Sequence, residues 1–342
     1  MRLSDFDYDL PQHSIAQRPL AERDASRLLV LERSTGQVWH RAFRDLPEIL
    51  VPGDLLVVNR SRVFPARLLG RRQGGGAAEV LLLRPLGEGE WEALVRPGRR
   101  LRESQEVRIC PELSVRIESE ALGHDGRRRV RLLADDPQAA VERFGSTPLP
   151  PYIRRPEEPA DRERYQTVYA REPGSVAAPT AGLHFTPDLL SRLETRGIRR
   201  AEITLHVGPG TFRPVAVEEI ERHRVEPEEF SIPAESAKAI REAKAGGRRV
   251  VAVGTTAVRA LEAGTLQDVP PRAHSGRTDL VIVPGFRFQV TDALLTNFHL
   301  PRSSLLLLVA AFAGRERVLA AYQEAIGIGY RFYSYGDAML IL

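Results

Sequence analysis

The chain has 342 residues, of which 42% are hydrophobic and 27% charged, and its formal net charge is +4. This length favours two domains, and the composition is that of a globular protein with a substantial hydrophobic core. A net charge this small does not by itself indicate a phosphate-binding surface, although all the positive side chains except Lys238 and Lys244 are arginines. The single cysteine, Cys110, excludes an internal disulfide and a cysteine-rich zinc site.

The sequence shows no feature that would place the protein in or across a membrane. The N-terminal residues have no basic stretch followed by an apolar one, and the longest apolar run, 305–313, is far shorter than the ~20 residues that span a bilayer. We therefore expect a cytoplasmic protein.

The first part of the chain predicts strands at 27–32 and 55–59. Between 63 and 147, short apolar or alternating runs are separated by turn signals about every 8–12 residues, which is typical of a small antiparallel β-barrel or sandwich. After this segment, 148–178 is rich in Pro, Arg, Glu and Tyr, and is either a loose linker or an ordered functional loop.

The rest of the chain alternates helix-like and strand-like runs, which indicates an α/β fold. The patterns predict helices at 186–196, 236–245, 257–263, 303–313 and 315–325, and strands at 202–207, 249–253, 280–283 and 338–342. The fold class expected is therefore an α/β main domain, 1–62 and 148–342, with an inserted small antiparallel β-barrel domain at 63–147.

Four loops in the α/β part combine Gly and Thr with an imidazole or an arginine, each next to the end of a predicted element. They are P-T-A-G-L-H-F-T (179–186), T-L-H-V-G-P-G-T-F-R-P (204–214), V-G-T-T-A-V-R (253–259) and T-N-F-H-L-P-R-S-S (296–304). In open α/β sheets ligands bind beyond the carboxyl ends of the strands, and helix N-termini there offer free N–H groups to anions. We expect these loops to form one site.

Three loop histidines, His184, His206 and His299, are the candidate catalytic groups. Each is flanked by apolar residues, so each could equally be a hydrogen-bonded core side chain. No pair has the spacing of a zinc motif, and we expect no metal. The sequence also lacks a P-loop, a dinucleotide-binding fingerprint and a G-x-S-x-G elbow.

Arginines are interspersed with aromatic residues in four further stretches, at 59–67, 150–155, 162–171 and 330–339. Such side chains can grip phosphates and stack on unpaired bases. The alternative is a charged, solvated loop.

Taken together, these stretches closely resemble one family, the S-adenosylmethionine:tRNA ribosyltransferase-isomerases of queuosine biosynthesis. The motifs that carry the resemblance run from the N-terminus to the last residues: N-R-S-R-V-F-P-A-R-L, Y-I-R-R, R-Y-Q-T-V-Y-A, G-S-V-A-A-P-T-A-G-L-H-F-T, L-H-V-G-P-G-T-F-R-P-V, V-G-T-T-A-V-R-A-L-E, T-N-F-H-L-P-R-S-S-L and Y-R-F-Y-S-Y-G-D-A-M. The resemblance implies an α/β domain with an inserted β-barrel.

The resemblance also implies an activity. Such enzymes transfer and isomerise the ribose part of S-adenosylmethionine onto 7-aminomethyl-7-deazaguanine at the tRNA wobble position. The products are epoxyqueuosine-tRNA, adenine and methionine. S-adenosylmethionine is consumed as a substrate, so no cofactor is expected, and we expect a monomer whose partners are that tRNA and S-adenosylmethionine.

This chemistry suggests roles for particular residues. A base must take a proton from the ribose carbon next to the sulfonium, and an acid must help adenine to leave; we assign both steps to His184 and His299, with His206 in support. The sulfonium favours aromatic faces, and the methionine carboxylate favours an arginine or a helix N-terminus. The expected substrate-binding residues are Thr180, Phe185, Thr211, Phe212, Thr255, Thr256, Arg259, Asn297 and Phe298. The expected tRNA-binding residues are Arg60, Arg62, Tyr152, Arg154, Arg155, Arg164 and Tyr165.

Two other functions stay open on the sequence. A tRNA-modifying methyltransferase would use the same cosubstrate, but the glycine-rich first loop of a Rossmann-like methyltransferase is missing. A non-catalytic RNA-binding protein would read RNA with its barrel, but the modest charge and the lack of RNP-type aromatic patterning count against it.

Overall fold

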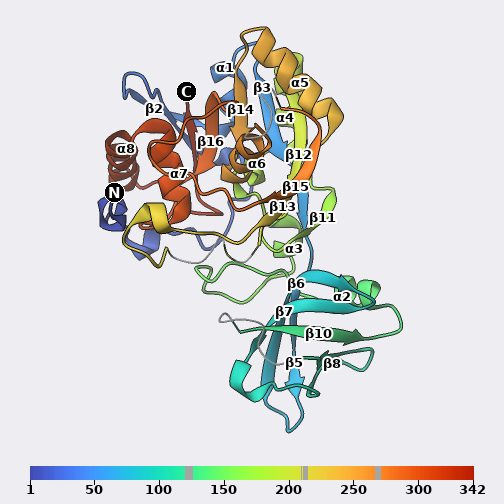
Figure 1. Cartoon of the computed structure of the whole chain (residues 1–342). Helices are drawn as coiled ribbons and strands as arrows, with labels where there is room; N and C mark the ends of the chain where they lie inside the picture. The colour runs from blue at the N-terminus through green and yellow to red at the C-terminus, as the bar shows by residue number, and fades with distance from the viewer. Residues whose placement is uncertain (120–125, 209, 211–214, 266–270) are drawn as a thin grey trace.

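The computed structural model describes residues 1–119, 126–208, 210, 215–265 and 271–342. It has two parts, a large α/β body that contains both termini and a β-barrel that projects from it (Figure 1). No helix among the described residues is both long and apolar enough to cross a membrane.

The barrel is formed by the segment for which the sequence predicts one. Six strands close it in the order β10-β7-β6-β5-β8-β9, and every pair is antiparallel. The strands are β5 (Arg67–Arg72), β6 (Ala77–Gly87), β7 (Glu90–Arg96), β8 (Glu106–Cys110), β9 (Leu113–Ile117) and β10 (Arg127–Leu133). Helix α2 (Pro137–Phe144) follows, capped by the side chain of Asp136. The strands lie inside 63–147, and the domain boundaries themselves stay a prediction.

The α/β body is built on a nine-stranded mixed sheet in the order β15-β13-β12-β3-β14-β16-β17-β1-β2. The four neighbours β12, β3, β14 and β16 are parallel to one another. The strands are β1 (Arg27–Leu31), β2 (Val38–Ala42), β3 (Leu55–Asn59), β12 (Arg199–Leu205), β13 (Glu228–Ile232), β14 (Val250–Val253), β15 (His274–Thr278), β16 (Ala293–Asn297) and β17 (Ala338–Ile341).

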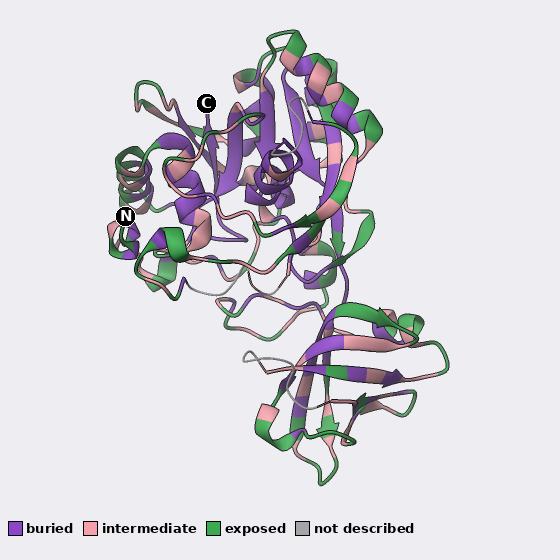
Figure 2. Cartoon of the chain, viewed as in Figure 1, coloured by how far each residue is buried: buried purple, intermediate pink, exposed green. Residues whose placement is uncertain are grey.

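The central part of the sheet is buried on both faces, and successive side chains of a strand there point into the two opposite layers. In β3, Leu55 and Val57 join one hydrophobic cluster, while Leu56 and Val58 join the other. The central strands β3, β14, β16 and β17 are buried along their whole length, whereas the edge strands β2 and β15 are partly exposed (Figure 2). Helices α5 (Ala234–Ala245), α6 (Thr255–Thr265), α7 (Ser304–Ala313) and α8 (Arg315–Gly327) cover the first face. Helices α1 (Leu46–Ile49) and α4 (Pro187–Thr195) cover the second.

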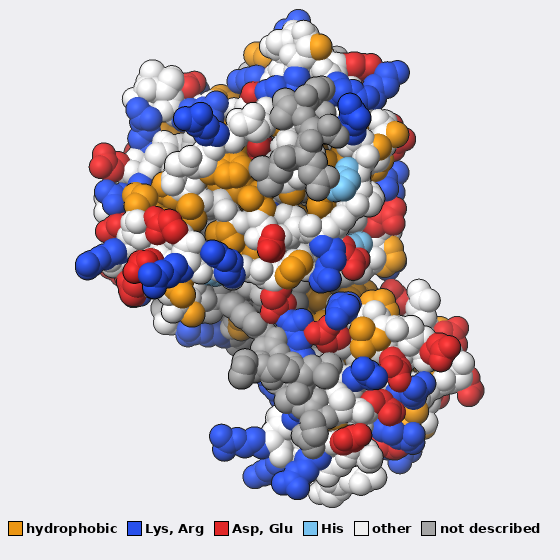
Figure 3. Space-filling model, in the orientation of Figure 1, with side chains coloured by type: hydrophobic (Ala, Val, Ile, Leu, Met, Phe, Trp, Pro, Cys, Tyr) orange, Lys and Arg blue, Asp and Glu red, His pale blue; other side chains and the backbone are white. Residues whose placement is uncertain are grey.

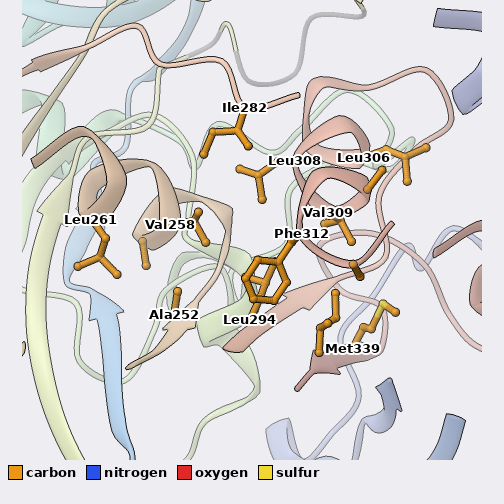
Figure 4. Packing of buried hydrophobic residues seen from close by; sticks show 14 of the residues in the cluster. Ala252, Val258, Leu261, Ile282, Leu294, Leu306, Leu308, Val309, Phe312 and Met339 are labelled. Atoms are coloured by element: carbon orange, nitrogen blue, oxygen red, sulfur yellow. The ribbon is translucent and has the colours of Figure 1, made fainter. Parts of the chain in front are cut away.

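The first layer is packed by apolar side chains from the sheet and from the helices that cross it. Figure 4 shows Ala252 of β14, Val258 of α6 and Phe312 of α7 among the side chains that meet there. A short two-stranded sheet, β4 (Ser61–Val63) with β11 (Glu172–Ser175), lies where the chain leaves for the barrel and after it returns. The segment 148–178 is ordered, since it contains β11 and the short helix α3 (Asp161–Arg164).

All five predicted helices form, with ends within about two residues of the predicted ones. The strand predicted at 280–283 is wrong. Those residues form no strand, and the edge strand of the sheet is β15 instead. Their apolar pattern has another cause, because Ile282 is buried against the first cluster and Leu280 and Val283 pack beside it as a loop. The sequence also missed β2, β13 and β16.

Candidate functional site

A small pocket lies where the loops meet, at the carboxyl ends of β14 and β16. It has a volume of about 40 Å³ and is lined by parts of the loops 177–181, 254–256 and 296–299, together with Val207 and Leu305. All four loops that the sequence singles out therefore contribute to it. Parallel strands bring their carboxyl ends to one edge of a sheet, which is why loops far apart in the chain converge.

A much larger cavity, about 840 Å³, opens between the barrel and the α/β body. Val207 and Leu305 line both hollows, so the two are adjacent. Acidic side chains outnumber basic ones in the described lining. The acids are Glu88, Glu90, Glu92, Asp136, Glu142, Glu226, Glu228 and Glu229, and the arginines are Arg84, Arg127, Arg259 and Arg277.

His184 ends the 3₁₀ helix η6 (Thr180–His184) and does not line the small pocket. Its ring is buried and lies 4.9 Å from the ring of Phe43. Both ring nitrogens are engaged, Nδ1 with the hydroxyl of Ser26 at 2.9 Å and Nε2 with the amide of Asn297 at 3.2 Å. Burial, with the nearby charge of Arg331, lowers the pKa of His184 to about 3. The imidazole is therefore neutral and fixed.

His299 lines the small pocket itself. Its Nε2 lies 2.8 Å from the hydroxyl of Thr296, and its backbone N–H donates to the hydroxyl of Tyr322. Among the described residues no hydrogen bond reaches its Nδ1. Burial lowers the pKa of His299 to about 3. Of the three histidines, this one combines a place at the pocket with a ring nitrogen not engaged by the protein.

His206 follows β12 and lines the large cavity. Its Nδ1 is buried and finds no hydrogen-bond partner in the part of the chain that the structure describes. Burial lowers its pKa, and the carboxylates of Glu229 and Glu172 oppose that change. Gly174 packs against the ring, where an added Cβ would lie 2.9 Å from it.

Four of the predicted substrate-binding residues, Thr180, Thr255, Thr256 and Asn297, line the small pocket. Gly254 precedes α6 with φ +89°, a left-handed conformation that turns the strand directly into the helix. Both threonines then begin the helix beside the pocket.

Arg259 lies on α6 and lines the large cavity. Its Nη1 pairs with Glu228 and its Nε donates to the carbonyl of Leu280 at 3.0 Å. Its Nη2 is buried and has no hydrogen-bond partner among the described residues. An unpaired guanidinium N–H is the kind of group that a carboxylate ligand satisfies.

The two aromatic candidates that the structure describes lie in the core. Phe185 packs edge-on against Phe43, and Phe298 packs against Tyr322 and Tyr330; both are fully buried. Neither presents a face to the pockets in this structure. The candidates Thr211 and Phe212 lie outside the described residues.

The predicted tRNA-binding residues fall into two groups. Arg62 and Arg154 are exposed, although Arg62 lies 3.9 Å from Glu142 and Arg154 donates to Gln12. The others are half-buried or buried: Arg60 pairs with Glu172, Arg155 pairs with Asp161, Arg164 donates to the carbonyls of Leu20 and Ala21, Tyr152 packs on Tyr333, and Tyr165 packs on Tyr335. Figure 3 shows acidic and basic side chains interspersed on the face in view, with no broad patch of one sign.

Sequence reasoning missed Ser26, Tyr333 and Ser334. Tyr333 and Ser334 line the small pocket, and Tyr333 has φ +74°, a conformation that is uncommon for a residue with a side chain and concentrates at functional sites. The stretch 330–339 was noted for its arginine and aromatic content, but nothing in it signals the backbone conformation. Ser26 precedes β1 and carries no motif.

Within the described ranges, no three His, Cys, Asp or Glu side chains are grouped so that they could hold a metal ion. The small pocket offers hydroxyl and amide groups, and the large cavity offers carboxylates and arginines. Such a set can bind a polar organic ligand with a positive centre and a carboxylate, and His299 can exchange a proton with it.

Comparisons with known proteins identify the family of this chain. Residues 3–341 match the model of a family described as "Queuosine biosynthesis protein". Proteins named S-adenosylmethionine:tRNA ribosyltransferase-isomerase from Thermotoga maritima, Aquifex aeolicus and Moorella thermoacetica are 52%, 51% and 55% identical, and the alignments cover 100% of this chain and of each relative.

The fold is also similar to a solved structure. A crystal structure of S-adenosylmethionine tRNA ribosyltransferase from Thermotoga maritima is 42% identical and aligns over 99% of this chain and 100% of its own, with a TM-score of 0.57. The chain therefore belongs to the S-adenosylmethionine:tRNA ribosyltransferase-isomerase family of queuosine biosynthesis, and it is an enzyme of that family.

Proposed function

We propose that this enzyme transfers and isomerises the ribose part of S-adenosylmethionine onto 7-aminomethyl-7-deazaguanine at the wobble position of a tRNA. The products are epoxyqueuosine-tRNA, adenine and methionine. S-adenosylmethionine is consumed as a substrate, and no cofactor takes part.

The observation that carries the proposal is the acid-rich cavity between the domains, adjacent to the small polar pocket. Both reactants bring a positive charge, the sulfonium of the donor and the aminomethyl group of the base. Carboxylates around a low-dielectric cavity favour such cations. A volume of about 840 Å³ is within the range of small-molecule sites.

His299 is the group that we assign to proton transfer in the small pocket. Its buried ring is uncharged near neutral pH, so its free Nδ1 is available to accept a proton from the ribose carbon next to the sulfonium. The Thr296 hydroxyl fixes the orientation of the ring through Nε2. His206 lies at the large cavity, where it acts in support.

Arg259 is assigned to the methionine carboxylate. Its buried Nη2 lacks a hydrogen-bond partner within the described ranges, and Glu228 together with the carbonyl of Leu280 holds the guanidinium in place. A carboxylate accepting from Nη2 would satisfy this group. The exposed Arg62 and Arg154 remain the candidates for contact with the tRNA backbone.

The test is an assay of the purified enzyme with S-adenosylmethionine and tRNA carrying the aminomethyl base. We expect free adenine and methionine in equal amounts and epoxyqueuosine in the tRNA. Formation of S-adenosylhomocysteine in their place would identify a methyltransferase and overturn the proposal.

A His299→Gln variant tests the assigned role in the same assay. Loss of a general base lowers kcat by about 10²- to 10⁴-fold, and we expect a fall in that range. The control is His40→Gln on the edge strand β2, whose side chain lies outside both pocket linings. Turnover by His299→Gln within a few-fold of the control would remove His299 from the mechanism.

A further inference from the structure

A continuous line of hydrogen bonds runs from the N-terminal part of the chain to the small pocket. The Ser26 hydroxyl donates to the carbonyl of Arg23 at 3.3 Å and lies 2.9 Å from Nδ1 of His184. Nε2 of His184 lies 3.2 Å from Nδ2 of Asn297, and Oδ1 of Asn297 accepts from the hydroxyl of Thr180 at 2.8 Å. Thr180 and Asn297 line the pocket, whereas His184 and Ser26 do not.

The direction of each bond follows from the chemistry of the groups. The amide nitrogen of Asn297 can only donate, so Nε2 of His184 accepts and Nδ1 carries the hydrogen. That hydrogen then goes to Ser26, whose own hydrogen is used by the carbonyl of Arg23. Every member is satisfied with a neutral imidazole, and a proton added at Nε2 would face the N–H of Asn297.

Burial agrees with a neutral ring. His184 is 4% exposed and packs on Phe43, and its pKa is lowered to about 3. Both ring nitrogens of His184 are engaged by Ser26 and Asn297, so neither is open to a substrate proton, although the sequence suggests His184 for proton transfer. The histidine instead fixes the orientation of the Asn297 amide.

At the pocket end, the amide oxygen of Asn297 has one hydrogen-bond acceptor site left. One amide hydrogen goes to His184 and the other points toward the carbonyl of Asp337 at 3.5 Å, so both donors face protein acceptors. Oδ1 has two lone pairs, and Thr180 uses one. The oxygen can accept one more hydrogen bond, from a ligand.

The pocket selects the size and charge of that ligand group. Its volume of about 40 Å³ exceeds the roughly 10–15 Å³ that a cavity needs to hold one water, so it has room for a small polar group. Apart from His299, no side chain in its described lining is ionisable at neutral pH. A neutral hydrogen-bond donor is therefore the matching ligand group.

We propose that Ser26 and His184 are positioning residues that hold the Asn297 amide, so that its oxygen accepts a hydrogen bond from a neutral donor on the nucleoside part of S-adenosylmethionine, a ribose hydroxyl or the adenine amino group. This inference rests on the proposed function, because it names the part of that substrate which Asn297 contacts.

The first test measures KM and kcat for S-adenosylmethionine in Ser26→Ala, His184→Leu and His184→Gln. We expect KM to rise about tenfold in Ser26→Ala and His184→Leu, as loss of one buried hydrogen bond predicts, with a smaller change in kcat. His184→Gln keeps an acceptor and a donor on one side chain, and we expect partial rescue. Ser231→Ala on β13, whose hydroxyl pairs with that of Ser275 away from both pockets, is the matched control for removal of a serine hydroxyl.

The pH profile separates positioning from catalysis. We expect kcat/KM of His184→Gln to show the same apparent pKa values as the original enzyme. Loss of one limb of the profile would mean that His184 transfers the proton. A KM within twofold of the control in both Ser26→Ala and His184→Leu would mean that the hydrogen bonds from Ser26 through His184 to Asn297 do not position the substrate. Either result overturns the proposal.

The second test uses binding of donor analogues to the original enzyme and to Asn297→Ala. One analogue lacks a ribose hydroxyl and one lacks the adenine amino group. The analogue that lacks the contacting donor should bind about tenfold more weakly than S-adenosylmethionine to the original enzyme and equally to Asn297→Ala. Equal losses in both proteins for every analogue would contradict the contact. If the original enzyme does not bind S-adenosylmethionine at all, the proposed function fails, which is a distinct outcome.

Discussion

The three loop histidines differ in their surroundings although their sequence contexts are alike. His184 is locked between Ser26 and Asn297, His299 reaches the small pocket, and His206 borders the large cavity. Proton transfer by His299 and positioning by His184 are separable roles, because only one of the two rings has a nitrogen left open.

The buried histidines also make the folded state sensitive to acid. In the folded protein His184 and His299 have pKa values of about 3, against an ordinary value of 6.5. Between these values the unfolded chain binds a proton that the folded chain does not, so stability is lost as pH falls from about 6.5 toward 3. Each histidine adds a slope of up to about 1.4 kcal/mol per pH unit.

We therefore expect the free energy of unfolding of His299→Gln to fall less steeply with acid than that of the original protein. Urea unfolding at pH 7, 6, 5 and 4 measures this, and His13→Gln is the control for loss of an exposed imidazole. Parallel curves for His299→Gln and the original protein would contradict a buried, neutral His299.

At the scale of elements, local signals place the ends of α4 correctly. Thr186 accepts a hydrogen bond from the backbone N–H of Leu189, Pro187 is the first helical residue, and Gly197 follows the helix with φ +77°. The N-terminus of α4 follows directly on η6, so the cap also fixes where His184 enters the core.

Replacing Thr186 by Ala should lower the free energy of unfolding by about 1 kcal/mol, because one helix N–H loses its acceptor. Thermal or urea unfolding measures the change. Thr195→Ala, at the exposed last residue of the same helix, is the matched control, and we expect a change within about 0.5 kcal/mol. A loss in Thr186→Ala no larger than in the control would show that the cap does not stabilise the helix.

Hydrophobic patterns mispredict strands where a loop that packs on the core is as apolar as a strand. The run at 280–283 is apolar because it covers a hydrophobic cluster as a loop. The carbonyl of Leu280 accepts a hydrogen bond from the side chain of Arg259. Conversely β16 was missed, since a short, wholly buried strand has no alternation to mark it.

On the scale of the whole molecule, an ionic bridge connects the barrel to the α/β body. Arg127 of β10 pairs with Glu92 of β7 at 2.7 Å and also with Glu226, which lies in the loop before β13. All three side chains line the large cavity. The bridge therefore helps to set the width of the proposed site.

Glu226→Gln removes the charge on the α/β side of this bridge. We expect the KM for tRNA to rise several-fold and the radius of gyration from small-angle scattering to increase, because the two domains are less firmly joined. Glu219→Gln, an exposed residue of the same body that pairs with Arg222, is the control. Unchanged scattering and KM in Glu226→Gln would show that the bridge does not hold the domains.

The sequence by itself determined the helices, most strands, the barrel within an α/β fold, the family, and the loops that form the site, because turn residues, caps and hydrophobic periods act over a few neighbouring positions. Only the tertiary structure decided which side chains meet. Ser26 and His184 are 158 positions apart, and His184 and Asn297 are 113 apart. Local patterns carry no information on such pairs; the order of strands in the sheet brings them together, and burial then decides which histidine is fixed and which is open.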